Sequence, residues 1–98
     1  MKVIIRESAE DDLDRIFNWI AKDNPHAAAN MVARIRDHIN LLELDSVVGM
    51  GRRGLIAGTR ELVEYPYIIV YGISERRDVL EVLTIVHGAR NREGERST

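Results

Sequence analysis

The spacing of apolar residues near the start of the chain changes from that of a strand to that of a helix. Lys2–Arg6 is rich in β-branched residues, which predicts a short strand. The apolar residues that follow recur at three- and four-residue intervals, typical of an amphipathic helix. We expect Ser8 to cap this helix, with Asp11 three residues behind it as in a capping box. The stripe consists of Ala9, Leu13, Ile16, Phe17 and Ile20.

A second helix is predicted directly behind the first. Asn24 is suited to cap it, and Pro25 suits the first helical position, where a missing N–H costs nothing. Because the connection is short, the two helices should form an antiparallel hairpin. The apolar stripe of the second helix is Ala28, Val32, Ile35, Ile39 and Leu42.

The second half of the chain predicts strands. A glycine-rich segment, Asp45–Gly58, is expected to be a loop. Strands are predicted over Arg60–Tyr65, Tyr67–Ile73 and Val79–His87, with a polar turn at 74–78. Short turns between these strands favour an antiparallel meander, with Leu62 and Val82 in the core.

The order β-α-α-β-β-β predicts an α+β fold, in which the helical hairpin covers one face of a small, mainly antiparallel sheet. Along Tyr67–Ile73, successive residues point to opposite faces, yet both sets are apolar. The second sheet face is therefore expected to be uncovered and to invite a partner. We expect residues 1–98 to form one domain, with residues 91–98 a flexible tail.

Composition narrows the classes of protein that fit. The chain has 98 residues, 45% of them hydrophobic, and no cysteine, which excludes disulfides and thiolate metal sites. We see no secretory signal and no membrane span, so a cytoplasmic protein is expected. The net charge of −2 and the pI near 5.9 do not favour a general nucleic-acid binder.

Gly49–Gly54 matches the pattern GxGxxG, but the context of a dinucleotide site is reversed. That site needs a strand before the loop and a helix behind it. Here a predicted helix precedes the loop and a predicted strand follows it. We interpret the segment as a flexible surface loop that offers Arg52 and Arg53 to an acidic partner.

Few side chains suggest chemistry, and each has a structural alternative. His26 and His38 have no metal-ligand spacing and are interpreted as solvated helix residues, so no metal or cofactor is expected. His87 could transfer a proton on a phosphate ester, or could simply bond a backbone carbonyl. Arg60 could recognise an anion or form an ion pair, and it should point away from the sheet face of Glu61.

Trp19 lies beside the apolar stripe of the first helix. A tryptophan in that place is interpreted as a residue at the edge of the core, and not as a platform for stacking.

In order and spacing, several segments together resemble the ParE/RelE toxins of bacterial type II toxin–antitoxin systems. The resemblance is carried by Gly58–Val63, Tyr67–Tyr71, Val82-Leu83 and His87–Arg90, and it covers residues 2–90. It implies a toxin neutralised by a cognate antitoxin encoded beside it. It also implies that the complex binds operator DNA only through the antitoxin.

The family has two activities, plasmid-stabilising gyrase poisons of the ParE kind and ribosome-dependent mRNA endonucleases of the RelE kind. Arg90 matches the family's arginine behind the last strand, but Val63 stands at or near the place of a RelE arginine. The tail Asn91–Thr98 holds neither Tyr nor His. These departures favour a growth-arresting DNA gyrase inhibitor that is not an enzyme.

Two alternatives remain at this point. One is an mRNA endonuclease that uses Arg60, His87 and Arg90, and the other is a degenerate toxin that serves as a binding and regulatory module. Residues expected to contact the antitoxin or the target are Arg52, Arg53, Arg60, Tyr67, Tyr71, His87 and Arg90.

Overall fold

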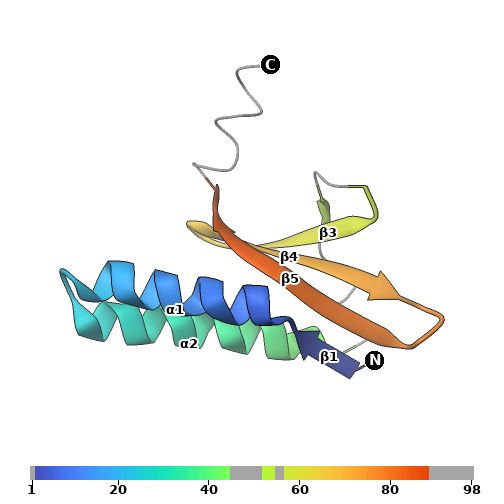
Figure 1. Ribbon diagram of the computed structural model, residues 1–98, viewed down its shortest axis with the longest axis horizontal. Coiled ribbons are helices and arrows are strands. Elements are labelled where there is room, and N and C mark those ends of the chain that lie inside the picture. The colour runs from blue at the N-terminus through green and yellow to red at the C-terminus, as the bar shows by residue number, and fades with distance from the viewer. Residues whose placement is uncertain (1, 45–51, 55–56, 89–98) are drawn as a thin grey trace, which may run out of the picture.

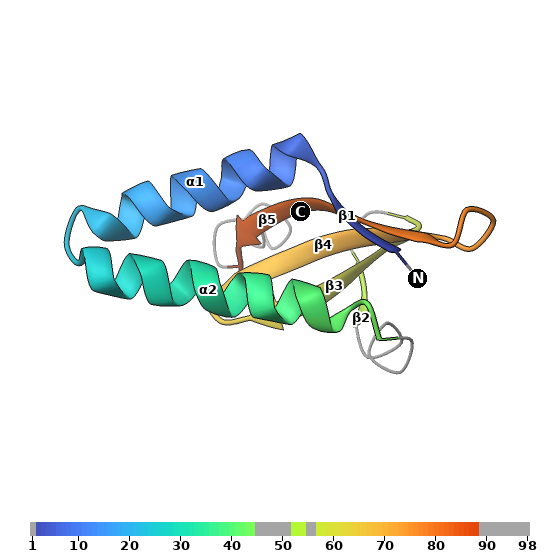
Figure 2. The same cartoon turned by 90° about the horizontal axis from the view of Figure 1, so that it is seen from below.

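The computed structural model describes residues 2–44, 52–54 and 57–88, and within them two layers are formed. A helical hairpin lies along one face of a five-stranded sheet (Figures 1 and 2). The predicted α+β fold is confirmed. The elements are β1 (Lys2–Ile5), α1 (Glu7–Ala21), α2 (Pro25–Leu41), β2 (Arg52–Arg53), β3 (Thr59–Glu64), β4 (Tyr67–Ser74) and β5 (Val79–His87).

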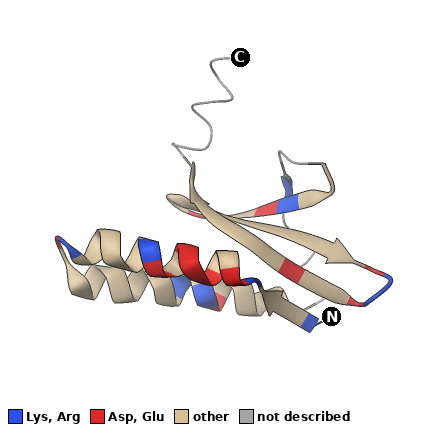
Figure 3. Ribbon diagram, in the orientation of Figure 1, with Lys and Arg blue, Asp and Glu red and all other residues tan. Residues whose placement is uncertain are grey.

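The strand order is β1-β5-β4-β3-β2, so the first strand lies beside the last. β1 and β5 are parallel, whereas the other neighbouring pairs are antiparallel, which confirms a mainly antiparallel sheet. Charged residues are absent from β4, which lies in the middle of the sheet (Figure 3).

One strand was not predicted. Arg52 and Arg53 pair with Glu61 and Arg60 of β3, so this part of the expected loop is an edge strand. A strand of two residues between glycines is too short to show the alternation of apolar and polar residues that predicts a strand. It forms because β3 offers it a pairing partner. Most of the remainder of the expected loop, residues 45–51 and 55–56, lies outside the described residues.

The two helices begin differently. α2 begins as predicted, with Pro25 first and the Asn24 side chain accepting a hydrogen bond of 3.0 Å from the Ala27 N–H. The prediction that Ser8 caps α1 is wrong. α1 already begins at Glu7, because the Arg6 N–H bonds to the Val82 carbonyl at 3.0 Å while the Arg6 carbonyl accepts from Ala9 and Glu10.

The hydrophobic core lies between the hairpin and the sheet. Ala9, Leu13 and Ile16 of α1 meet Ile35 and Ile39 of α2, and both helices cover the sheet. Val82 is fully buried as predicted, and Leu62 packs partly buried against the core. The sheet contributes Tyr67, Ile69, Tyr71, Leu80, Val82 and Ile85.

Glu10 and Arg36 join the two helices across their interface. Two parallel hydrogen bonds of 3.1 and 3.0 Å connect the guanidinium to the carboxylate. This hydrogen-bonded arginine lowers the pKa of Glu10 below its usual range, although partial burial opposes the shift, and the carboxylate in turn raises the pKa of Arg36. The pair is a fork-shaped, charge-assisted contact with part of its surface still in water.

The second sheet face is less open than the sequence suggested. Ile68 and Val70, the apolar residues of β4 on that face, are only 4% and 6% exposed. Gly88 lies close to Ile68, and its N–H donates to the Pro66 carbonyl at 2.9 Å. Val63 on β3 is 43% exposed, so within the described part of this face an exposed apolar side chain lies on the β3 side.

No helix in the described part of the chain is long and apolar enough to cross a membrane. The predicted flexible tail, residues 91–98, lies outside the described residues, as does Arg90.

Candidate functional site

A bulge in β5 determines how α1 meets the sheet. Val70 pairs with Thr84 and the next residue, Tyr71, pairs with Val82, so Leu83 has no partner across the ladder. A bulge of this kind turns the local backbone and redirects its polar groups. Here those groups face α1.

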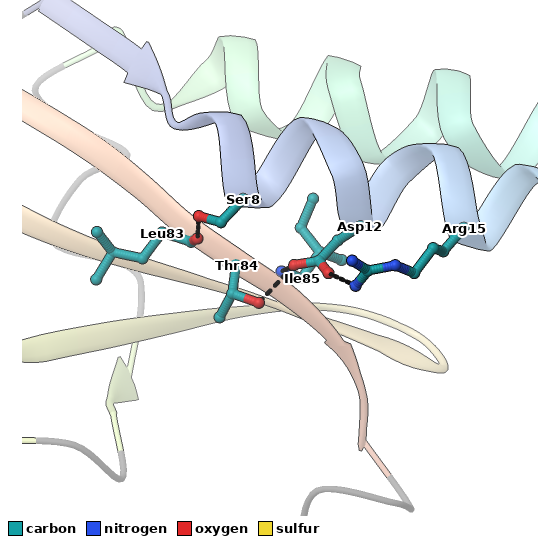
Figure 4. A network of polar contacts seen from close by, with 6 residues as sticks. All are labelled: Ser8, Asp12, Arg15, Leu83, Thr84 and Ile85. Atoms are coloured by element: carbon teal, nitrogen blue, oxygen red, sulfur yellow. Dashed lines mark hydrogen bonds and ion pairs between the residues drawn. The ribbon is translucent and has the colours of Figure 1, made fainter.

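Two side chains of α1 bind the bulged backbone (Figure 4). The Ser8 hydroxyl donates to the Leu83 carbonyl at 2.7 Å. One oxygen of Asp12 accepts from the Thr84 hydroxyl at 2.5 Å and from the Ile85 N–H at 3.0 Å. The other oxygen accepts from Arg15 at 3.1 Å, so the Asp12 carboxylate is engaged on both sides.

One turn farther along α1, a cleft of about 330 Å³ opens between the helix and the end of β5. We call it the α1–β5 cleft. Ile16, Tyr67 and Ile85 give it apolar walls, while Arg15 and Trp19 are exposed at its rim. The Lys22 ammonium lies 5.2 Å from the centre of the Trp19 ring. The lining residues are Asp12, Arg15, Ile16, Trp19, Tyr67, Ile85 and His87.

His87, the last residue of β5, also lines this cleft. Its ring packs edge-to-face on Tyr67, with the ring centres 5.5 Å apart and the planes at 82°. Nδ1 is buried without a hydrogen-bond partner among the described residues. The carbonyl partner proposed for this histidine is therefore not found at Nδ1, and the ring is held by packing instead.

A second cleft, of about 610 Å³, lies near the opposite edge of the sheet, around the β2–β3 connection. Arg53 and Arg60 line it, together with Gly54, Ala57, Gly58, Thr59 and Ile73. Gly58 has a φ of +81°, a left-handed conformation that favours glycine.

The arginines of β2 and β3 have different environments. Arg52 donates to Glu61 at 3.1 Å, and Glu61 is only 3% exposed, so Arg52 balances a buried carboxylate. Arg53 is exposed. As predicted, Arg60 and Glu61 face opposite sides, since Arg60 lies opposite Tyr71 and Glu61 opposite Val70.

The two described members of the candidate nuclease set, Arg60 and His87, lie far apart. Arg60 lies on β3, where it pairs with Tyr71 of β4. His87 lies on β5, on the other side of β4, where it pairs with Tyr67. Those tyrosines are four residues apart, about 13 Å along the strand, and two strand spacings add about 10 Å across it. The backbones of Arg60 and His87 are thus roughly 16 Å apart, and their side chains line different clefts.

Several other expectations need correction. Tyr71 is 0% exposed, so it cannot contact a partner from this position, and Tyr67 is 6% exposed and reaches only the cleft wall. Trp19 is 60% exposed and not at the edge of the core. His38 is half-buried, with Nδ1 3.5 Å from the Glu64 carboxylate, whereas His26 is exposed as expected.

Sequence reasoning missed Ser8, Asp12 and Arg15 as site residues. A signal for them existed, because Ser8, Asp12, Arg15 and Trp19 recur at four, three and four residues and so share one edge of α1. Among the described residues, no three His, Asp or Glu side chains group as metal ligands.

Comparison with known proteins adds independent information. The family model "ParE toxin of type II toxin-antitoxin system, parDE" matches residues 3–92. A protein of Sinorhizobium fredii (strain NBRC 101917 / NGR234), named "Putative toxin Y4kP", is 49% identical over 77 residues, which cover 76% of this chain and 75% of that protein.

Solved structures with the same fold include toxins of three bacteria. A chain of a chromosomal ParDE system from P. aeruginosa matches with a TM-score of 0.76 at 22% identity, covering 89% of this chain and 95% of that one. A chain of the RelBE2 toxin–antitoxin complex from Mycobacterium tuberculosis matches with 0.66 at 17% identity, covering 88% and 95%. A YoeB/ParE toxin from Agrobacterium tumefaciens matches with 0.60 at 26% identity, covering 89% and 98%.

Proposed function

We propose a function from the premise that this chain belongs to the ParE toxin family and is the toxin of a type II toxin–antitoxin system. Within that family, we propose that it arrests growth by inhibiting DNA gyrase and does not cut RNA. Such a toxin would act in the cytoplasm and would stabilise a plasmid or locus that carries it.

The observation that carries the choice of gyrase is the separation of Arg60 and His87. Cleavage of RNA without a metal needs a base, an acid and cations around one phosphate, all within hydrogen-bond reach. Two residues whose backbones lie roughly 16 Å apart, on different clefts, do not form such a constellation. An arginine is moreover a poor proton donor, because its guanidinium keeps its proton at neutral pH.

The residue at position 63 and the net charge of the chain also favour a gyrase inhibitor over an RNA endonuclease. Val63, at or near the place of a RelE arginine, is an exposed apolar residue. The chain also carries a net charge of −2, which is unfavourable for approach to the dense phosphate surface of a ribosome.

A cognate antitoxin is the partner that this function requires. The structural relatives come from ParDE and RelBE systems, in which a toxin is paired with its antitoxin. We expect the antitoxin to be encoded beside this chain, to neutralise it by direct binding, and to carry the contacts to operator DNA.

The proposal is tested with purified toxin in two parallel reactions. With DNA gyrase, ATP and supercoiled plasmid, we expect loss of supercoiling activity and enzyme-linked DNA breaks, both prevented by prior addition of the antitoxin. In a translating extract we expect no codon-specific cuts in the mRNA. The reverse pattern would establish the endonuclease alternative.

His87→Ala separates the two activities in cells. We expect the folded variant to remain toxic, because its imidazole takes no part in inhibiting gyrase. In an endonuclease, loss of one acid–base group would reduce the rate about 10²–10⁴-fold and remove toxicity. Growth after induction is scored together with the unfolding temperature, which controls for misfolding.

A further inference from the structure

β2 and β3 place two arginines directly opposite each other. Arg53 pairs with Arg60 in the antiparallel register, so the two side chains lie on the same face of the sheet. Arg60 also lies opposite Tyr71, which belongs to the core, so this is the face toward the helical hairpin. Both arginines line the cleft of about 610 Å³ at the β2–β3 connection, which we call the β2–β3 cleft.

The charges of this cleft differ from those of the neighbouring cross-strand pair. One residue earlier on β2, Arg52 lies opposite Glu61 and donates to its carboxylate at 3.1 Å. Like charges directly opposite each other destabilise a pair of strands, whereas opposite charges stabilise it. No aspartate or glutamate is among the described residues that line the cleft. An anion bound between Arg53 and Arg60 would therefore replace repulsion by attraction.

The backbone of the cleft is fixed on both sides of Arg53. The Gly54 N–H donates to the Thr59 carbonyl at 2.8 Å, so the contact between the two strands continues beyond Arg53. A Cβ at Gly54 would collide with the Thr59 hydroxyl, which a glycine avoids. Arg60 is half-buried and has a further interaction within the chain, whereas Arg53 is exposed. The Arg60 side chain is thus the more restricted of the two, and Arg53 can turn toward a ligand.

The geometry of the arginine side chain determines which anion fits. A guanidinium presents its N–H donors as a planar fork that matches the oxygens of a phosphate or a carboxylate. One fork saturates a planar carboxylate, as Arg36 does with Glu10, whereas two forks can bind the tetrahedral oxygens of a phosphate from different sides. Apart from Ile73, the other described lining residues are small, and they leave room for the sugar that carries the phosphate.

We propose that the β2–β3 cleft binds a phosphate of the DNA backbone between Arg53 and Arg60. In the complex with gyrase this is a phosphate of the DNA that the enzyme holds, and in this respect the inference rests on the proposed function. A single cleft neutralises about one phosphate, too few for tight DNA binding without a protein partner. The net charge of −2 agrees with a local contact, since the chain as a whole does not attract DNA over long distances.

Binding is tested first on the toxin alone, by nuclear magnetic resonance at low salt with a short DNA duplex as the probe. We expect chemical-shift changes centred on Arg53, Gly58 and Arg60, and about tenfold weaker binding by Arg53→Gln. The slope of log affinity against log salt should decrease in magnitude by about one in this variant. Arg76→Gln, in the exposed turn before β5, is the matched control and should bind within twofold of wild type. The unfolding temperatures show that both variants are folded.

Other probes establish the source of the phosphate. ATP or inorganic phosphate that binds the cleft more tightly than the duplex would assign the site to a free phosphate compound instead of DNA. A glutamate-rich peptide that binds more tightly than the duplex would assign it to protein carboxylates and overturn the inference. A duplex that shifts no residue of the cleft, or that binds Arg53→Gln as tightly as wild type, would overturn it as well.

The link to gyrase is tested by measuring the affinity of the toxin for gyrase with and without bound DNA. We expect DNA to strengthen binding of wild type and Arg76→Gln alike, and to strengthen binding of Arg53→Gln much less. An equal effect of DNA on all three would overturn the inference and leave the proposed function intact. Wild-type toxin that binds the duplex through the cleft but neither binds nor inhibits gyrase would contradict the proposed function and uphold the DNA site.

Discussion

At the scale of single residues, Asp12 has the largest structural role that the sequence did not reveal. Its carboxylate holds α1 against the bulged part of β5 through the Thr84 hydroxyl and the Ile85 N–H. Charge-assisted hydrogen bonds of this kind contribute about 1.5–3 kcal/mol each to stability. The same contacts shape the base of the α1–β5 cleft.

Asp12→Ala should therefore reduce the free energy of unfolding by about 2–3 kcal/mol, because it leaves the Ile85 N–H without its acceptor. Urea unfolding measures the change. Asp11→Ala, at the exposed neighbouring position, serves as control and should change stability by less than about 0.5 kcal/mol. Equal stability of the two variants would show that the Asp12 contacts are replaced by water at no cost.

The limits of sequence reasoning at this scale are visible in Arg60, His87 and Tyr71. The sequence shows that each of these side chains carries a polar group. The distances between them depend on the order of the strands in the sheet, which no local sequence pattern predicts. Tyr71 illustrates a second limit, since a tyrosine in a central strand can be fully buried or exposed without any change in sequence period.

At the scale of elements, the start of α2 and both bounds of β5 were predicted correctly, because strong local signals delimit them. Asn24-Pro25 begins the helix, and the polar turn before Val79 begins the strand. β2 and the parallel pairing of β1 with β5 were not predicted. Both depend on partners distant in sequence, and so does the partial covering of the second sheet face.

The contact between the two helices makes a pH-dependent prediction. Arg36 lowers the pKa of Glu10, so the pair stabilises the fold at pH values above the usual pKa of a glutamate. This contribution is lost as the pH falls through the lowered pKa. Each side chain is 42% exposed, so solvent screening limits the contribution to less than about 1 kcal/mol.

Glu10→Gln should thus be slightly less stable than wild type at neutral pH and nearly equal to it in strong acid. Thermal unfolding across pH 2–7 measures the convergence of the two curves. Arg15→Gln is the comparison variant. It removes the ion pair between Arg15 and Asp12, in which the arginine is more exposed and solvent screens the charges more strongly. A constant difference between wild type and Glu10→Gln at every pH would contradict the assigned role of the ion pair.

At the scale of the whole molecule, a chain of 98 residues has a modest core, and several large apolar side chains remain exposed. Phe17, Trp19, Leu41 and Leu44 all lie on the helical hairpin or directly behind it. A small domain with such a surface gains much from a partner that binds the native state alone.

We expect the antitoxin to raise the unfolding temperature strongly. At a free antitoxin concentration of 100 times Kd, mass action stabilises the native toxin by about 2.7 kcal/mol. For a domain of this size, that corresponds to roughly 10–20 °C. Differential scanning fluorimetry of the toxin with increasing antitoxin measures the shift, and a Tm that does not move would argue against binding to the folded toxin.

The position of β1 beside β5 bears on how the toxin is made. Contacts such as Arg6–Glu81 join residues 75 apart in sequence, and Ser8 and Asp12 likewise await Leu83–Ile85. During translation, the first strand and first helix leave the ribosome without the strand that completes their surroundings. The sheet can close only when residue 87 has emerged, after the helical hairpin that faces it has been synthesised. Antitoxin already present in the cell can therefore meet the chain before its sheet has closed.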